Sequence, residues 1–86
     1  MPSDEQIRTR LRAWVLTKAT GLSAADLTDR TPLFEERHLR SVHLPELLLL
    51  LERLRASPID VEDLRPGDFR DIRTMVARFG GAQVTP

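Results

Sequence analysis

The sequence predicts an all-α fold, a small bundle of three main helices plus one short helix. Three stretches carry apolar residues at intervals of three and four, as expected when one face of a helix is buried. No stretch alternates polar and apolar residues for more than a few positions, as a half-buried strand would. With 86 residues, the chain can build one small hydrophobic core and has no room for a second. We therefore expect a single domain over residues 1–86.

The first helix is predicted over residues 3–18. Ser3, with Gln6 three positions later, matches the capping box that begins many helices. The apolar positions of this helix share one face: Ile7, Leu11, Trp14 and Val15. Trp14 continues that face, so we assign it to the core. Gly21 ends the element.

A long connection separates this helix from the next. The segment LSAADL, residues 22–27, predicts a brief turn of helix capped by Ser23, with Leu22 and Leu27 pointing inward. Residues 28–40 contain Pro32 and show no lasting period. They also contain three large apolar side chains, which a solvated loop would not carry: Leu33, Phe34 and Leu39. We expect this connection to lie against the core.

The second helix is predicted to begin at Ser41 and to run to about Arg55. Its core-facing stripe consists of Leu47, Leu50, Leu51 and Leu54. Pro45 lacks the N–H that a helix interior requires, and it is tolerated near the first turn. This proline therefore indicates that the helix begins close to Ser41 and no earlier.

Two further helices are predicted after residue 55. Prolines on both sides leave room only for a short third helix around Val61 to Leu64. The last helix is capped by Asp71, and Gly80 and Gly81 close it. Its apolar face consists of Ile72, Met75, Val76 and Phe79.

Composition narrows the function classes. The 13 basic and 13 acidic residues cancel, so the chain as a whole has no field that would attract nucleic acid or an anionic membrane. Without cysteine, the chain has neither a disulfide framework nor a thiol nucleophile of its own. The start MPSDEQIRTR lacks the apolar core of a signal peptide, and the run Leu47 to Leu51 is far below the roughly 20 residues that span a bilayer. We expect a soluble, cytoplasmic protein.

The stretch LFEERHLRSVHLPELLLLLERL resembles the segment around the modified serine of acyl and peptidyl carrier proteins. The positions that match the family pattern are Leu33, Phe34, Glu36, Leu39, Ser41, Glu46, Leu47 and Leu51. The likeness extends to GLSAADLTDRTPLF and to FRDIRTMVARF, so that it covers roughly residues 5–79. It departs from the family at His38, where glycine is usual, at Arg40, where aspartate is usual, and at Pro45.

The resemblance implies a discrete acyl or aminoacyl carrier protein, which is not an enzyme. Ser41 would carry a covalent 4'-phosphopantetheine arm, and the thiol of the arm would hold the cargo as a thioester. A helix start suits this role, because its unpaired N–H groups stabilise an anionic phosphodiester. Arg40 would add a positive charge beside the same phosphate. The implied partners are a phosphopantetheinyl transferase, a loading ligase or acyltransferase, and downstream biosynthetic enzymes.

The surface that would meet these partners is predicted from the leucine-rich helix. If the stripe of Leu47 and Leu51 faces the core, then Val42, Pro45 and Leu49 form a second apolar strip that leads away from Ser41. His43 and Glu46 lie in the same region. Arginines outnumber acids over residues 37–55, so we expect partners whose docking surface is not strongly basic. This points to a specialised, secondary-metabolite pathway. We expect a monomeric carrier.

Several alternatives stay open on sequence alone. Ser41 is also an ordinary helix cap, and Leu49 is also a residue that the 28–40 connection could bury. The chief alternative function is an unmodified helical protein-interaction module with the carrier fold. His38 and His43 are interpreted as solvent-facing or partner-facing, since their spacing suits neither a metal pair nor a hydrolase. A helix-turn-helix DNA binder is disfavoured by the zero net charge.

Overall fold

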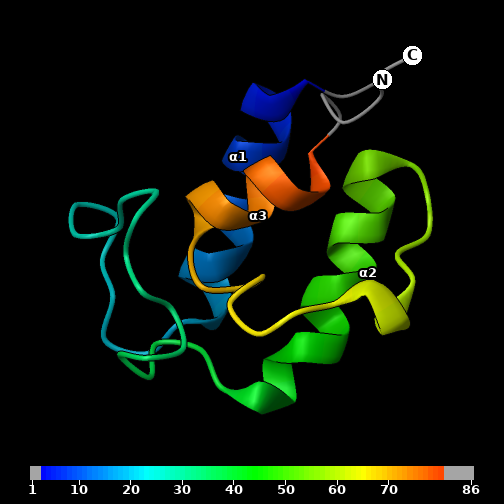
Figure 1. The fold of residues 1–86 in the computed structure, drawn as a ribbon. Coiled ribbons are helices and arrows are strands. Elements are labelled where there is room, and N and C mark those ends of the chain that lie inside the picture. The colour runs from blue at the N-terminus through cyan, green and yellow to red at the C-terminus, as the bar shows by residue number, and fades with distance from the viewer. Residues whose placement is uncertain (1–2, 81–86) are drawn as a thin grey trace.

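The computed structural model describes residues 3–80, and this part of the chain is all-helical, without strands (Figure 1). The α-helices are α1 (Asp4–Lys18), α2 (Leu44–Arg55) and α3 (Ile72–Phe79), and the 3-10 helices are η1 (Ser41–His43) and η2 (Val61–Asp63). Helix α1 packs against both α2 and α3. The predicted fold class is therefore confirmed, with the short fourth helix reduced to a 3-10 turn. No helix within residues 3–80 has the length and apolar character needed to cross a membrane.

Helix α1 begins as the sequence predicts. The Gln6 N–H donates to Ser3 Oγ at 3.2 Å, and the Ser3 N–H donates to Gln6 Oε1 at 3.0 Å. This reciprocal pair satisfies two of the backbone donors that a helix start leaves free. The helix ends at Lys18, three residues before Gly21, which takes a left-handed φ of 69° in the loop that follows.

Two predicted helical segments are shorter in the structure than in the prediction. The LSAADL segment is a single hydrogen-bonded turn, in which the N–H groups of Asp26 and Leu27 both donate to the Ser23 carbonyl. The helix expected over Val61 to Leu64 is the 3-10 helix η2, capped by the Asp60 side chain. Pro66 keeps the residue before it out of the helical region, so the chain has no room for a second turn.

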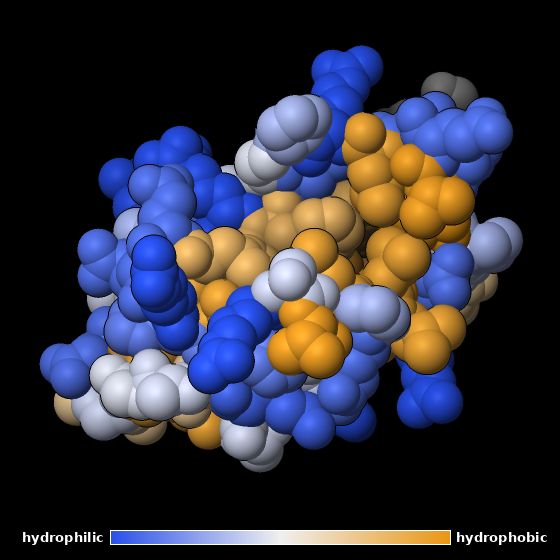
Figure 2. Space-filling view, turned by 90° about the horizontal axis from the view of Figure 1, so that it is seen from below, coloured by the Kyte–Doolittle hydropathy of each residue, from blue (hydrophilic) through white to orange (hydrophobic). Residues whose placement is uncertain are grey.

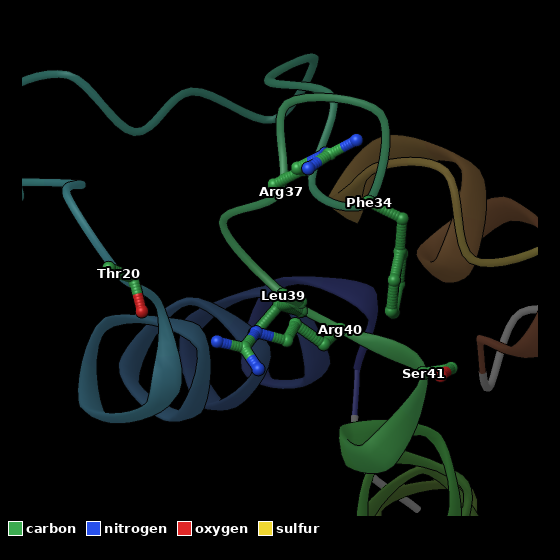
Figure 3. A pocket seen from close by; sticks show the side chains of 6 residues that line it. All are labelled: Thr20, Phe34, Arg37, Leu39, Arg40 and Ser41. Atoms are coloured by element: carbon green, nitrogen blue, oxygen red, sulfur yellow. The ribbon is translucent and has the colours of Figure 1, made fainter.

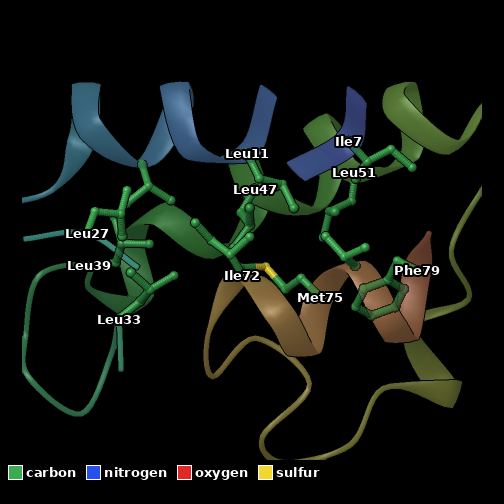
Figure 4. Packing of buried hydrophobic residues seen from close by; sticks show 12 residues of the cluster. Ile7, Leu11, Leu27, Leu33, Leu39, Leu47, Leu51, Ile72, Met75 and Phe79 are labelled. Atoms are coloured by element: carbon green, nitrogen blue, oxygen red, sulfur yellow. The ribbon is translucent and has the colours of Figure 1, made fainter. Parts of the chain in front are cut away.

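The core gathers side chains from all three helices and from the first connection (Figure 4). Its fully enclosed apolar members are Ile7, Leu11, Val15, Leu27, Leu33, Leu39, Leu47, Leu51, Ile72, Met75, Val76 and Phe79. Figure 4 shows Leu27, Leu33 and Leu39 side by side at one end of this core. The connection thus lies against the core as predicted, and each buried leucine contributes about 1.5–3 kcal/mol.

Helix α2 ends in a left-handed residue that is not glycine. Ala56 takes φ 59°, and its N–H donates to the carbonyls of Glu52 and Arg53. Glycine is the usual residue here, because a Cβ in the left-handed region meets the neighbouring backbone. The sequence carries no signal for this conformation, since alanine favours the helix interior.

Replacement of Ala56 by glycine is expected to raise the free energy of unfolding by up to about 1 kcal/mol, because it removes the left-handed strain. The matched control is Ala13→Gly in the exposed middle of α1, which is expected to lower that free energy by about 1 kcal/mol. Urea unfolding followed by circular dichroism measures both changes. Equal destabilisation by the two substitutions would contradict the assigned conformation of Ala56.

Candidate functional site

Ser41 is the first residue of η1, which continues directly into α2. Its side chain is exposed, and its hydroxyl has no hydrogen-bond partner among residues 3–80. The residue that caps this turn is Arg40, so the interpretation of Ser41 as an ordinary helix cap is wrong. The prediction that an α-helix begins at Ser41 is also wrong by one turn, because α2 begins at Leu44. Within the described part of the chain, the Ser41 hydroxyl is therefore presented to solvent without a hydrogen-bond partner.

Pro45 explains the 3-10 turn that carries Ser41. In an α-helix, the N–H of residue 45 would donate to the Ser41 carbonyl, and proline has no N–H. The chain instead satisfies this carbonyl with the N–H of Leu44, through the shorter bond of a 3-10 helix. Pro45 is the second residue of α2, where its ring causes little strain.

His43 stabilises the same 3-10 turn through two hydrogen bonds with Arg40. The Arg40 N–H donates to His43 Nδ1 at 3.0 Å, and the His43 N–H donates to the Arg40 carbonyl at 2.9 Å. Because Nδ1 accepts a hydrogen bond, the neutral ring carries its proton on Nε2. The ring also meets Trp14 edge to face, with centroids 6.4 Å apart. His43 is half-buried, and its contact with a partner stays a prediction.

His38 ties the segment before Ser41 to the end of α1. The Thr20 N–H donates to the His38 carbonyl at 3.0 Å, and His38 Nδ1 donates to the Thr20 carbonyl at 3.0 Å. A carbonyl only accepts, so this ring carries a proton on Nδ1. His38 is half-buried, and its contact with solvent or a partner stays a prediction. The sequence alone could not identify Thr20 as the partner of His38, because the two residues lie 18 positions apart.

An open hollow of about 660 Å³ lies beside Ser41, lined by Thr20, Phe34, Arg37, Leu39, Arg40 and Ser41 (Figure 3). Both charged side chains of the lining are arginines, and neither guanidinium has an acceptor within the described part of the chain. Figure 3 shows the Arg40 guanidinium directed toward the Thr20 side of the hollow, while the Ser41 side chain points the other way. The structure therefore brings Arg40 into the same hollow as Ser41 without pairing it to the hydroxyl.

Arg37 was not among the predicted site residues. It has a left-handed φ of 61°, rare for a residue with a Cβ, and its N–H closes a turn onto the Phe34 carbonyl at 3.1 Å. No sequence signal marks this conformation, since glycine or asparagine would be the usual choice. The turn is what places a second arginine beside Ser41.

Phe34 also lines a second hollow, of about 440 Å³, together with apolar groups from distant segments, among them Leu44, Pro66 and Phe69. Phe69 stacks on Phe79 with ring centroids 5.5 Å apart, which fixes one wall. The hollows are adjacent, since Phe34 belongs to both. The sequence could not place Phe69 here, because the 56–71 connection has no helical period.

Glu46, predicted to meet partners, is engaged within the protein. Trp14 Nε1–H donates to Glu46 Oε2 at 3.2 Å, and Lys18 Nζ lies 3.1 Å from the same oxygen. These donors lower the pKa of the Glu46 carboxyl below its ordinary value of 4.5, the indole hydrogen bond first. Trp14 is half-buried, so its predicted place in the core is corrected to the edge of the core.

The predicted apolar strip is exposed, as expected. Val42 is 73% exposed and Leu49 is 58% exposed, and Pro45 is exposed between them. The alternative in which the first connection buries Leu49 is therefore wrong. Figure 2 shows the side of the molecule that lies at the bottom of Figure 1. On that side, apolar side chains gather in a hollow and along one edge.

Comparison with protein-family models, with curated proteins and with solved structures found no match to this chain. Within residues 3–80, no three or more histidine and acidic side chains converge as ligands for a metal ion.

Replacement of His43 by alanine is expected to lower the free energy of unfolding by about 1 kcal/mol, because the Arg40 N–H loses its acceptor. His43→Gln is the matched control, since glutamine at this position can accept the same hydrogen bond. Thermal and urea unfolding measure the difference. Equal losses for the two variants would show that the imidazole acts through its contact with Trp14 instead.

The lowered pKa of Glu46 predicts a stability contribution that is present above pH 4.5 and lost as the pH falls through the lowered value. Trp14→Phe removes the indole donor and is expected to raise the pKa of Glu46 toward its ordinary value. Lys18→Met removes both a hydrogen bond and the attraction of a positive charge, so it is also expected to raise the pKa of Glu46. Titration of the Glu46 carboxyl carbon by NMR measures each pKa, and an unchanged pKa in Trp14→Phe would contradict the assignment.

Proposed function

We propose that this chain is a discrete acyl or aminoacyl carrier protein that holds its substrate as a thioester on a phosphopantetheine arm at Ser41. The observation that carries the proposal is the exposed hydroxyl of Ser41, which has no partner among residues 3–80 and stands at the first position of a helical segment. The proposal includes a non-catalytic role, a cytoplasmic location, a monomeric state and a specialised biosynthetic pathway.

The attachment needs one covalent step, and Ser41 can supply its nucleophile. The Ser41 oxygen forms a bond to the phosphorus at the pantetheine end of the coenzyme A pyrophosphate. The bond between that phosphorus and the bridging oxygen breaks, and 3',5'-ADP leaves. The hydroxyl proton passes to a base of the transferase or to water. An exposed, unbonded hydroxyl needs no rearrangement of the carrier before this step.

The surroundings of Ser41 suit the product of this step. The phosphodiester is an anion, and the N–H groups at the start of a helical segment favour negative charge. Arg40 is exposed and unpaired within the described residues, so its side chain is free to turn toward the phosphate. The apolar hollow on the other side of Phe34 offers a surface on which an apolar cargo can rest.

A second candidate is an unmodified helical interaction module. Arg40 favours it, because arginine stands where carriers usually have aspartate. The exposure of Val42 and Leu49 serves either function, since both need a partner surface.

Incubation with coenzyme A and a broad-specificity phosphopantetheinyl transferase separates the two functions. We expect the intact mass of the wild type to increase by one phosphopantetheine, and that of Ser41→Ala to stay unchanged. Ser23→Ala is the matched control, because Ser23 is exposed in a turn of the first connection and is expected to leave the mass increase intact. No increase in the wild type, even with a transferase from the native host, would favour the interaction module.

A further inference from the structure

We propose that the phosphopantetheinyl transferase of this carrier docks on it with an acidic surface, which receives Arg37 and Arg40 beside Ser41. This inference rests on the proposed function and names the chemistry of one partner. The two arginine charges beside the serine are not neutralised by any side chain of residues 3–80.

Both arginines lie beside the serine that the transferase must reach. Ser41 must enter the active site of the enzyme that modifies it, and Arg37, Arg40 and Ser41 line one hollow. Val42, the next residue, is 73% exposed and follows Ser41 into any contact. The Ser41 side chain points away from the Arg40 guanidinium (Figure 3), so an enzyme that reaches the hydroxyl meets both arginines where its surface extends over the adjoining hollow.

A partner that covers these arginines must supply hydrogen-bond acceptors for their guanidinium groups. Neither guanidinium has an ion-pair or hydrogen-bond partner within residues 3–80, so each is hydrated in the free protein. Loss of that hydration against another protein is unfavourable unless the partner supplies acceptors, and carboxylates are the strongest of these. A neutral or basic docking surface would leave two charges unpaired.

The acidic residues of this protein near Ser41 do not act as acceptors for Arg37 and Arg40. Glu46 accepts from Trp14 and pairs with Lys18, so its charge is already balanced. Glu35 lies 3.9 Å from Arg70 and lines the second hollow. Glu36 is exposed in the same turn as Arg37, but lines neither hollow. The charge around the serine therefore stays positive, although the whole chain is neutral.

The test measures arm transfer by the transferase of the native host at saturating coenzyme A, with intact mass as the readout. The variant is Arg37→Gly with Arg40→Glu. Glycine suits the left-handed φ of residue 37, and the capping contacts of residue 40 use only its backbone, so the fold is expected to persist. Arg73→Glu is the matched control, because Arg73 is exposed, unpaired within the described residues and part of neither hollow.

We expect the KM for the carrier to increase roughly three- to tenfold in the double variant, with kcat little changed, and to stay unchanged in Arg73→Glu. Added NaCl is expected to raise the KM of the wild type more than that of the double variant. An unchanged or lower KM in the double variant would overturn the inference and leave the carrier function standing. Absence of transfer to the wild type would overturn both.

Binding without chemistry provides a second readout. Ser41→Ala keeps the surface and removes the nucleophile, so its affinity for the transferase reports docking alone. Calorimetric titration is expected to show weaker binding when Arg40→Gln is added to Ser41→Ala. Equal affinities for the single and double variants would contradict a role of this arginine in docking, independently of any effect on the transfer step.

Discussion

The anchoring of the connection between α1 and α2 is the constraint on which the position of Ser41 depends. This connection has no regular structure, and it is held by burial of Leu27, Leu33 and Leu39 and by backbone hydrogen bonds to distant segments. The Leu33 N–H donates to the Arg70 carbonyl at 3.0 Å, which joins it to the residues before α3. The doubled hydrogen bond between Thr20 and His38 joins it to the end of α1. A long loop without such anchors would leave the serine without a defined position.

Pro45 and His43 determine the local backbone geometry at Ser41. Pro45 removes one backbone donor, and the chain responds with a 3-10 turn whose carbonyls bond three residues ahead. His43 then accepts the Arg40 N–H, which the turn itself leaves free. Together they leave the Ser41 hydroxyl unused by the cap. A serine in the capping position would have its oxygen occupied by a backbone N–H, and would be a poorer nucleophile for that reason.

The surface around Ser41 is positively charged, although the whole chain is neutral. The zero net charge of the whole chain does not predict the charge of any one face. Ion pairs within the fold neutralise some charged side chains and leave others unpaired at the surface. Lys18 and Glu46 neutralise each other, with Trp14 as a second donor, whereas Arg37 and Arg40 stay unpaired within residues 3–80. The exposed apolar residues are Val42 in η1 and Leu49 in α2. A partner for this face therefore needs both apolar and acidic groups.

The sequence by itself determined the three main helices, because capping and apolar periodicity act over a few neighbouring residues. Only the structure decided that Leu49 stays exposed, since the sequence left open its burial by the first connection. The predicted start of α2 at Ser41 was wrong by one turn, because Pro45 lacks the N–H that would bond to the Ser41 carbonyl and the 3-10 helix η1 forms instead. Only the tertiary structure decided the roles of Glu46, His38 and His43. Glu46 meets Trp14 across 32 positions, and His38 meets Thr20 across 18, so no local pattern could encode either pair. The left-handed turn at Arg37 was likewise decided by how the connection folds back onto the core, and that packing puts two arginines beside one serine.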